Sequence, residues 1–334
     1  MSFRLILILT VLLTGCSGQE TLQTQTEEPL LKPGWPSLPD RERIRYLYSI
    51  ENYNDLGLRL PFSKRFRDIV GGKVPQTMVR PYAIALDEGL MAVADPGSGA
   101  IHLFNNERKL YEKIERIGDT QLNSPIGVSL AGNRVFIADS SLNEVFILNR
   151  RLKPVAIISA LNRPTALAWD ETTQRLFVAE THAHRIQGYD KDGGHLFTFG
   201  KRGDGPADFN FPTHLSVQNG QLLVNDTMNF RVQIFDIDGN HIKTMGTHGD
   251  SQGFLSNPKG VAFDSQGNVY VAEALRNRIQ IFNKNGTFLM DFGSDGTAAG
   301  EFSMPAGMFI FKDRLYICDS RNGRVQVFEY LKDE

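Results

Sequence analysis

The chain has 334 residues, of which 41% are hydrophobic and 22% are charged, and its formal net charge is −2. This is an ordinary globular composition, sufficient for one large domain or two small ones. A charge so close to zero argues against a nucleic-acid partner, which requires a basic surplus on one face.

The first residues have the layout of a secretory signal. A cation at Arg4 precedes an apolar run from Leu5 to Leu13, which is too short to span a bilayer as a retained helix. The segment "LTGC", Leu13 to Cys16, resembles a bacterial lipobox, in which Cys16 receives the lipid and becomes the first mature residue. We therefore expect residues 1–15 to be a lipoprotein signal peptide and the mature protein to be anchored in the bacterial cell envelope. Ser17 rather than Asp at the next position favours the outer membrane. The alternatives to a lipoprotein signal are a plain secretory signal with an incidental cysteine and a buried helix.

Residues 16–40 are interpreted as a flexible tether from the lipidated Cys16. They are polar as far as residue 32 and continue as "PGWPSLPD", a stiff, turn-prone segment. Cys318 is the second of two cysteines, so processing leaves no pair for an internal disulfide. It lies in the apolar stretch "RLYICDS", which is typical of a buried thiol, and the chain has no C-x-x-C-H motif, so no haem is attached to it.

The folded domain is predicted over residues 41–334, beginning with an isolated strand at 43–50, "RIRYLYSI". An insert at 51–80 contains "PFSKRFRDIVGG", which predicts a short helix with Ser63 as N-cap and Gly71 after its end. Its apolar side would comprise Phe62, Phe66, Ile69 and Val70, with Lys64, Arg65 and Arg67 facing outward. The helix would either dock on the domain with a solvated basic face or contact a partner or membrane headgroups.

Six copies of one unit follow, spaced 39 to 48 residues apart and starting at Pro81, Pro125, Pro164, Pro212, Pro258 and Pro305. Each copy carries short alternating apolar strands and tight turns such as "DKDGG" and "NKNGT". A repeat of four short antiparallel strands is one propeller blade, so the sequence predicts an all-β six-bladed β-propeller. The sixth copy lacks an outer strand, and we expect strand 43–50 to complete that blade and close the ring.

The later copies, for example "LSNPKGVAFDSQGNVYVAEALRNRIQIFNKNG", resemble NHL repeats. Together with the lipobox, residues 43–334 resemble bacterial NHL-repeat six-bladed β-propeller lipoproteins. The resemblance implies the fold, and it implies binding of other molecules as the commonest use, but it does not imply one reaction.

An acid ends the second strand of every copy, and an arginine follows five residues later in four of them. The acids are Asp95, Asp139, Glu180, Asp226, Glu273 and Asp319, and the arginines are Arg185, Arg231, Arg278 and Arg324. A carboxylate there can accept backbone N–H bonds and pair with the guanidinium on the returning strand. A catalytic pair is needed once, so this repetition indicates a structural ladder.

The connections entering copies four to six are long and rich in glycine, which predicts a lopsided face with more loop over these blades. The candidate binding residues on that face are Arg202, Asp204, Asp208, His182, His184, His214 and His248. Three of them, His182, His214 and His248, could converge on a Zn²⁺ ion. Such a site would resemble the peptide-amidating lyases, but their metal histidine directly follows the blade proline, and His214 stands one residue later. A Ca²⁺ site like that of lactonase propellers lacks carboxylates at the starts of the inner strands, so no cofactor is expected.

These observations leave three hypotheses. The leading one is a non-catalytic, lipid-anchored envelope propeller that acts as a binding or scaffold module for a protein or glycan on its loop-rich face. The alternative is a metal-dependent hydrolase or lyase that uses His214 and neighbouring loop histidines. The third is a structural subunit of an envelope complex, for example one containing exported cytochromes or surface-polysaccharide machinery.

Overall fold

The computed structural model describes residues 32–37, 39–62, 64–65 and 76–331, which lie in one compact unit that begins at Lys32. The predicted signal peptide, Cys16 and the predicted tether as far as residue 31 lie outside the described residues. Within the described ranges, no helix is long and apolar enough to cross a membrane.

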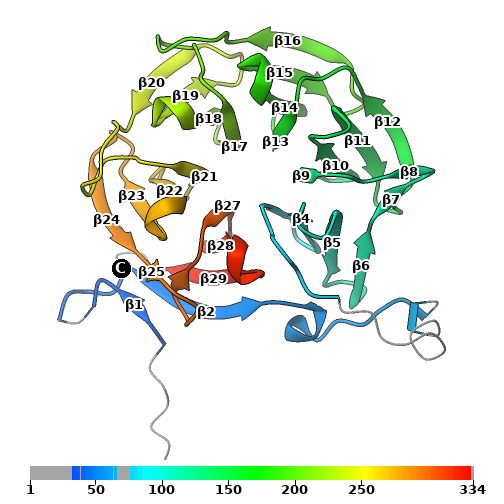
Figure 1. The fold of residues 1–334 in the computed structure, drawn as a ribbon, viewed down its shortest axis with the longest axis horizontal. Helices are drawn as coiled ribbons and strands as arrows, with labels where there is room; N and C mark the ends of the chain where they lie inside the picture. Colours follow the sequence, from blue (N-terminus) through cyan, green and yellow to red (C-terminus); the bar gives the residue numbers. More distant parts are fainter. Residues whose placement is uncertain (1–31, 38, 63, 66–75, 332–334) are drawn as a thin grey trace, which may run out of the picture. The chain divides into compact units, whose positions relative to one another are not determined.

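Six antiparallel sheets form a ring of blades (Figure 1). Blade one comprises β3 (Ala83–Leu86), β4 (Leu90–Asp95), β5 (Ala100–Asn105) and β6 (Leu110–Ile114). Blade two comprises β9 (Pro125–Ala131), β10 (Arg134–Asp139), β11 (Glu144–Asn149) and β12 (Pro154–Ile158). Blade three comprises β13 (Pro164–Asp170), β14 (Arg175–Glu180), β15 (Arg185–Asp190) and β16 (His195–Phe199). Blades four to six comprise β17 (Pro212–Gln218), β18 (Gln221–Asp226), β19 (Arg231–Asp236) and β20 (His241–Met245); β21 (Pro258–Phe263), β22 (Val269–Glu273), β23 (Arg278–Phe282) and β24 (Phe288–Phe292); and β27 (Pro305–Phe311), β28 (Arg314–Asp319) and β29 (Arg324–Tyr330). The innermost strands contact one another in ring order, from β3 through β27 and back to β3. The prediction of a six-bladed, all-β propeller is therefore confirmed.

The N-terminal strand closes the ring as predicted. Strand β2 (Ile44–Ile50) pairs antiparallel with β29, from Ile44 opposite Tyr330 to Ile50 opposite Val325. A two-residue strand, β1 (Gly34–Trp35), adds to the outside of β2, and the Trp35 ring lies 5.5 Å from that of Phe292. The prediction of a flexible tether up to residue 40 was thus wrong for residues 34–35, because backbone pairing fixes them to blade six and the Trp35 ring packs on Phe292 of blade five.

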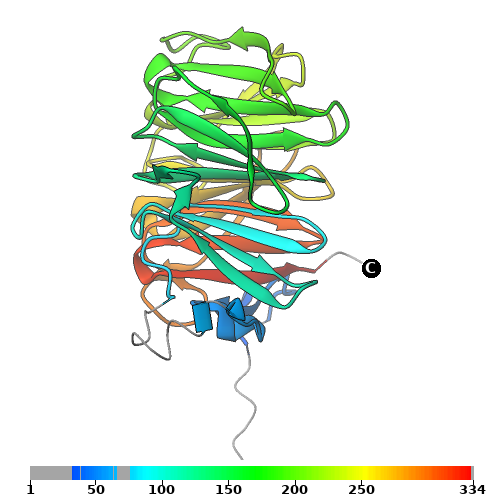
Figure 2. The same cartoon turned by 90° about the vertical axis from the view of Figure 1, so that its right-hand side faces the viewer.

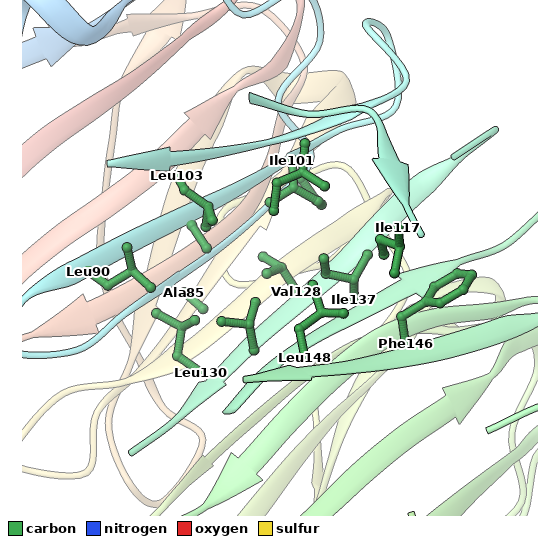
Figure 3. Packing of buried hydrophobic residues seen from close by; sticks show 14 of the residues in the cluster. Ala85, Leu90, Ile101, Leu103, Ile117, Val128, Leu130, Ile137, Phe146 and Leu148 are labelled. Atoms are coloured by element: carbon green, nitrogen blue, oxygen red, sulfur yellow. The ribbon is translucent and has the colours of Figure 1, made fainter. Parts of the chain in front are cut away.

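The blades are held together by apolar side chains that interleave between neighbouring sheets. Figure 3 shows the cluster between blades one and two, in which Leu103, Val128 and Ile137 are buried against one another. All six residues of β4 are buried, because a middle strand of a blade is covered on both faces by its neighbours. This explains why such strands read as nearly continuous apolar runs.

The ring has two faces, which lie on opposite sides in the edge-on view (Figure 2). The ladder face carries the loops that lead into the blade prolines and the short turns after the acids, four of which are 3₁₀ helices: η2 (Thr181–Ala183), η3 (Thr227–Asn229), η4 (Ala274–Arg276) and η5 (Ser320–Asn322). The hairpin face carries the tight turns between the first and second and between the third and fourth strands, for example residues 87–89 and 106–109.

The insert before blade one follows the outer edge of that blade. After the 3₁₀ helix η1 (Tyr53–Leu56), Arg59 forms a parallel bridge with Leu110, and the Lys64 ammonium donates to the Lys113 carbonyl at 3.1 Å. Phe62, Lys64 and Arg65 are helical, but the Phe62 side chain is 77% exposed. The docking alternative is therefore wrong for Phe62, and contact of this segment with a partner or membrane headgroups stays a prediction. The other residues of the predicted helix, 63 and 66–71, lie outside the described residues.

Candidate functional site

The six repeated acids tie the incoming loops to the blades. Asp95, Asp139, Glu180, Asp226, Glu273 and Asp319 are all fully buried. Each accepts the backbone N–H of the residue two positions before the blade proline, for example from Asn210 to Asp226 Oδ1 at 2.6 Å and from Ser303 to Asp319 Oδ1 at 2.7 Å. Because a buried carboxylate needs such donors, the acids serve the architecture of the ladder face.

Three of the four repeated arginines complete the ladder. Arg231 Nε donates to Asp226 Oδ2 and Arg324 Nε to Asp319 Oδ2, both at 2.8 Å, and Arg185 Nε bonds to Glu180 Oε2. Two of these guanidiniums also hold the incoming loop: Arg231 donates to the carbonyls of Asp204 at 2.6 Å and Asp208 at 2.9 Å, and Arg324 donates to that of Glu301 at 3.0 Å. These contacts fix the loop backbone next to the charged pair.

Blade five departs from this pattern. Arg278 does not pair with Glu273; its Nη1 donates to Asp291 Oδ2 at 2.8 Å instead. Asp291 is available because it lies on the outer strand β24, directly opposite Gln280. Glu273 Oε2 accepts from Ser256 and Asn257, and Glu273 Oε1 is left without a hydrogen-bond partner. The expected Glu273–Arg278 rung is therefore absent from this blade.

A further ladder position was missed in the sequence. Two residues after each ladder arginine stands a glutamine, and Gln233 donates to both the Asp208 carbonyl at 2.7 Å and Asp226 Oδ2 at 3.3 Å. The repeated "R-x-Q" pattern, at Gln187, Gln233, Gln280 and Gln326, was the available signal.

In blade one, His102 takes the place of this glutamine. It lies 3.2 Å from Asp95 Oδ2 and 2.8 Å from the Tyr111 hydroxyl. Burial by itself raises the pKa of the Asp95 carboxyl, but hydrogen bonds from His102, Val79 and Arg80 together hold that pKa well below its usual range.

The long loops into blades four, five and six share one construction. Arg202 forms a parallel β-bridge with Phe209, His248 forms one with Leu255, and Asp295 pairs in parallel with Phe302. In each case the two residues are seven positions apart in the sequence. The candidates Arg202 and His248 therefore occupy equivalent places rather than unique ones. Arg202 and Asp204 are exposed and Asp208 is half-buried, so part of the predicted binding face is accessible.

Each of the four candidate histidines contacts different residues. His182 is exposed and lies 2.9 Å from Arg163 Nη1, and the exposed His248 ring lies 4.2 Å from that of Phe230. His184 is buried and accepts from the Phe211 N–H at 3.2 Å. Over the described part of the chain, no three His, Cys, Asp or Glu side chains lie close enough to hold a metal ion.

His214 lies below the ladder face, in the mouth of the central channel. It is 6% exposed, its ring centroid is 5.0 Å from that of Tyr82, and Nε2 has no hydrogen-bond partner of normal geometry. Burial and the nearby Lys259 charge lower the pKa of His214 to about 3, and the Tyr82 backbone offsets this in part. The adjacent cavity measures 30 Å³. The expectation that His184 and His214 belong to an accessible binding face was therefore wrong, because both are buried.

A hollow lies on the hairpin face, opposite the predicted binding face. It measures 660 Å³ and is shared by blades one, two, three and six. Its apolar lining comprises Leu86, Leu90, Leu103, Leu110, Leu130, Leu152, Trp169, Phe309, Ile310 and Phe311. Its charged lining comprises Asp87, Glu88, Glu107, Glu112, Glu171, Arg108 and Arg150. No single repeat carries this combination, so sequence patterns did not reveal it.

Contacts within and between blades hold the walls of the hollow. Arg150 of blade two forms an ion pair with Asp87 of blade one, and its Nε donates to the Gly132 carbonyl at 2.8 Å. The Trp169 indole N–H donates to Glu171 Oε2 at 2.6 Å, and its ring stacks on Phe136 at 5.4 Å. Because both aromatic and charged walls are already fixed, the hollow is preformed.

Comparison with known proteins agrees with this fold. Residues 255–282 match the family model of the NHL repeat, and no curated protein matches the sequence. Virginiamycin B lyase from Staphylococcus aureus superposes with a TM-score of 0.57 at 10% identity, covering 76% of this chain and 96% of that one. Kuenenia stuttgartiensis hydrazine synthase superposes with a TM-score of 0.55 at 10% identity, covering 79% of this chain and 99% of that one. A chain of a nidogen/laminin complex superposes with a TM-score of 0.52 at 17% identity, covering 64% of this chain and 79% of that one. At these identities the likeness shows the fold alone. The chain is thus a six-bladed β-propeller that carries an NHL repeat.

Proposed function

We propose that this protein is a non-catalytic binding module, anchored to the bacterial envelope through a lipid on Cys16, that holds a protein partner in the hollow of its hairpin face. The observation that carries this proposal is the 660 Å³ hollow with an apolar, partly aromatic floor and a charged rim. Protein interfaces combine an aromatic-rich centre with a polar rim in the same way. A propeller of similar fold in a nidogen/laminin complex supports a protein partner in general.

The ladder face supports the proposal by contrast. Its buried acids, arginines and glutamines bind the backbones of its own loops, as Arg231 and Gln233 do with the loop at Asp204 and Asp208. These polar groups stabilise the blades and have little remaining capacity for a ligand. The hydrolase or lyase alternative would need His182, His214 and His248 to converge, and each of them has a different neighbour.

Co-purification from detergent-solubilised membranes tests this function. The wild-type protein, a Phe311→Ala variant in the hollow and an Arg202→Ala/Asp204→Ala variant on the ladder face are compared. We expect the partner to be lost from the Phe311 variant and retained by the ladder-face variant, because Phe311 lines the hollow. A Cys16→Ser variant should be released from the membrane fraction.

The opposite pattern, with the partner lost from the ladder-face variant alone, would overturn the choice of face. Stoichiometric zinc in the purified protein that disappears on replacing His214 would instead favour the metal-dependent alternative.

A further inference from the structure

We infer that the hollow of the hairpin face accepts a basic segment of the partner protein, in which lysine or arginine side chains alternate with leucine or aromatic ones. This inference rests on the proposed function and specifies the chemistry of the occupant.

The charges around the hollow are unbalanced. Five carboxylates line it, Asp87, Glu88, Glu107, Glu112 and Glu171, against the two guanidiniums of Arg108 and Arg150. An excess of carboxylates at a rim attracts cationic groups and repels anionic ones.

Internal ion pairs cancel some of these charges and leave the excess in place. Asp87 is paired with Arg150, and Glu88 lies 2.5 Å from the Lys312 ammonium. Glu107, Glu112 and Glu171 have no such cationic partner among the described side chains, and Arg108 is the one lining cation left to offset them. Glu107 and Glu112 are exposed, so a ligand cation can reach them from solvent.

The floor of the hollow fits apolar side chains. Leu103 and Leu130 are buried, while Leu152, Phe309 and Phe311 are half-buried and still have surface to cover. Burial of apolar surface contributes about 25 cal/mol per Å², so leucine or aromatic side chains of the partner would supply most of the affinity. The half-buried Trp169 ring can also receive a cation against its open face, because its other face is stacked on Phe136.

The walls would need little rearrangement to bind such a segment. Arg150 is held at both ends by Asp87 and Gly132, and Trp169 is held by Glu171. Side chains that are already fixed lose little conformational entropy on binding, which favours recognition of an extended peptide segment.

Selection from a random linear-peptide display library tests the inference. The bait is a Trp35→Phe variant, in which Trp169 is the single remaining tryptophan and reports occupation of the hollow by its fluorescence. We expect enrichment of peptides that combine Lys or Arg with Leu, Phe or Trp. Their binding should change the Trp169 emission and weaken as salt is raised.

A double variant and a matched control test the role of the carboxylates at the rim. Glu107→Gln/Glu112→Gln should weaken binding of the selected peptides by about two- to thirtyfold, since each exposed carboxylate contributes about 0.2–1 kcal/mol. The matched control Asp119→Asn neutralises an exposed acid in the turn between β7 (Arg116–Ile117) and β8 (Thr120–Gln121), outside the hollow, and should change nothing.

The inference is overturned if no peptide is enriched, if acidic or uncharged peptides are enriched, or if Glu107→Gln/Glu112→Gln binds the basic peptides as tightly as the bait does. Loss of the native partner from Phe311→Ala together with its full retention by Glu107→Gln/Glu112→Gln would leave the proposed function intact and refute the basic occupant. Retention of the native partner by both Phe311→Ala and Glu107→Gln/Glu112→Gln would refute the proposed function itself.

Discussion

Among single residues, His214 shows how burial changes a side chain that would otherwise suit metal binding. Its ring lies against Tyr82 in the channel mouth, where there is little water to hydrate an imidazolium. The nearby Lys259 ammonium opposes protonation further, and together these effects lower the pKa of His214 to about 3. The imidazole is therefore neutral in the folded protein at any ordinary pH.

This burial predicts a pH-dependent contribution to stability. The unfolded chain binds a proton at His214 below about pH 6.5, whereas the folded protein binds it near pH 3, so the contribution is complete above the first value and is lost as the pH falls. Relative to His214→Phe, the wild-type protein should lose about 2 kcal/mol of unfolding free energy between about pH 7 and about pH 5. Urea unfolding at both pH values measures this difference. An unchanged difference would show that the imidazole is hydrated in the folded state.

At the level of structural elements, the ladder joins each blade to the loop that leads into it. In blade four, Asp226 Oδ2 accepts three side-chain donors, from Asn229, Arg231 and Gln233. In blade five, Glu273 Oε2 takes the loop donors and Oε1 has none. Loss of the carboxylate charge at this position should therefore destabilise blade four more than blade five.

Matched amide substitutions should separate these two blades. Asp226→Asn would turn an N–H₂ group toward three donors or break the bond to the loop, so we expect it to cost about 3–5 kcal/mol of unfolding free energy. Glu273→Gln can place its N–H₂ group where Oε1 has no partner, and should cost about 1 kcal/mol. Chemical denaturation measures both, with the exposed Asp250→Asn as a control that should stay within about 0.5 kcal/mol of wild type. Equal losses in the two blades would contradict this account.

For the whole molecule, stability depends on closing the ring. Strand β2 covers the edge of β29 and completes blade six, so its removal would leave β29 as an open edge and separate the first and last parts of the folded chain. The apolar clusters that join blade six to blades one and five also include residues of β2, such as Ile44 and Ile50.

Two truncations test ring closure. A chain that starts at residue 32 keeps every described strand and should unfold at the same temperature as a chain that starts at Cys16. A chain that starts at residue 51 lacks β1 and β2 and should unfold at a markedly lower temperature and self-associate through the exposed edge. Thermal unfolding with light scattering measures both effects. Equal melting of the two truncated chains would show that β2 is dispensable.

The sequence by itself determined the number of blades, their order, the outer strands and the closing strand. These features follow from local signals, because strand alternation, turn residues and the blade prolines repeat within each unit of 39 to 48 residues. The structural role of the ladder acids was also predicted, since an acid recurs at the same place in every copy.

Only the tertiary structure decided which groups meet. Arg278 pairs with Asp291 rather than Glu273, because an outer strand brings a second carboxylate within reach. Trp35 contacts Phe292 of blade five and Phe328 of blade six, which stand far along the chain. The hollow gathers Asp87, Trp169 and Phe311 from three different blades, and closing the ring brings them together although no local pattern relates them.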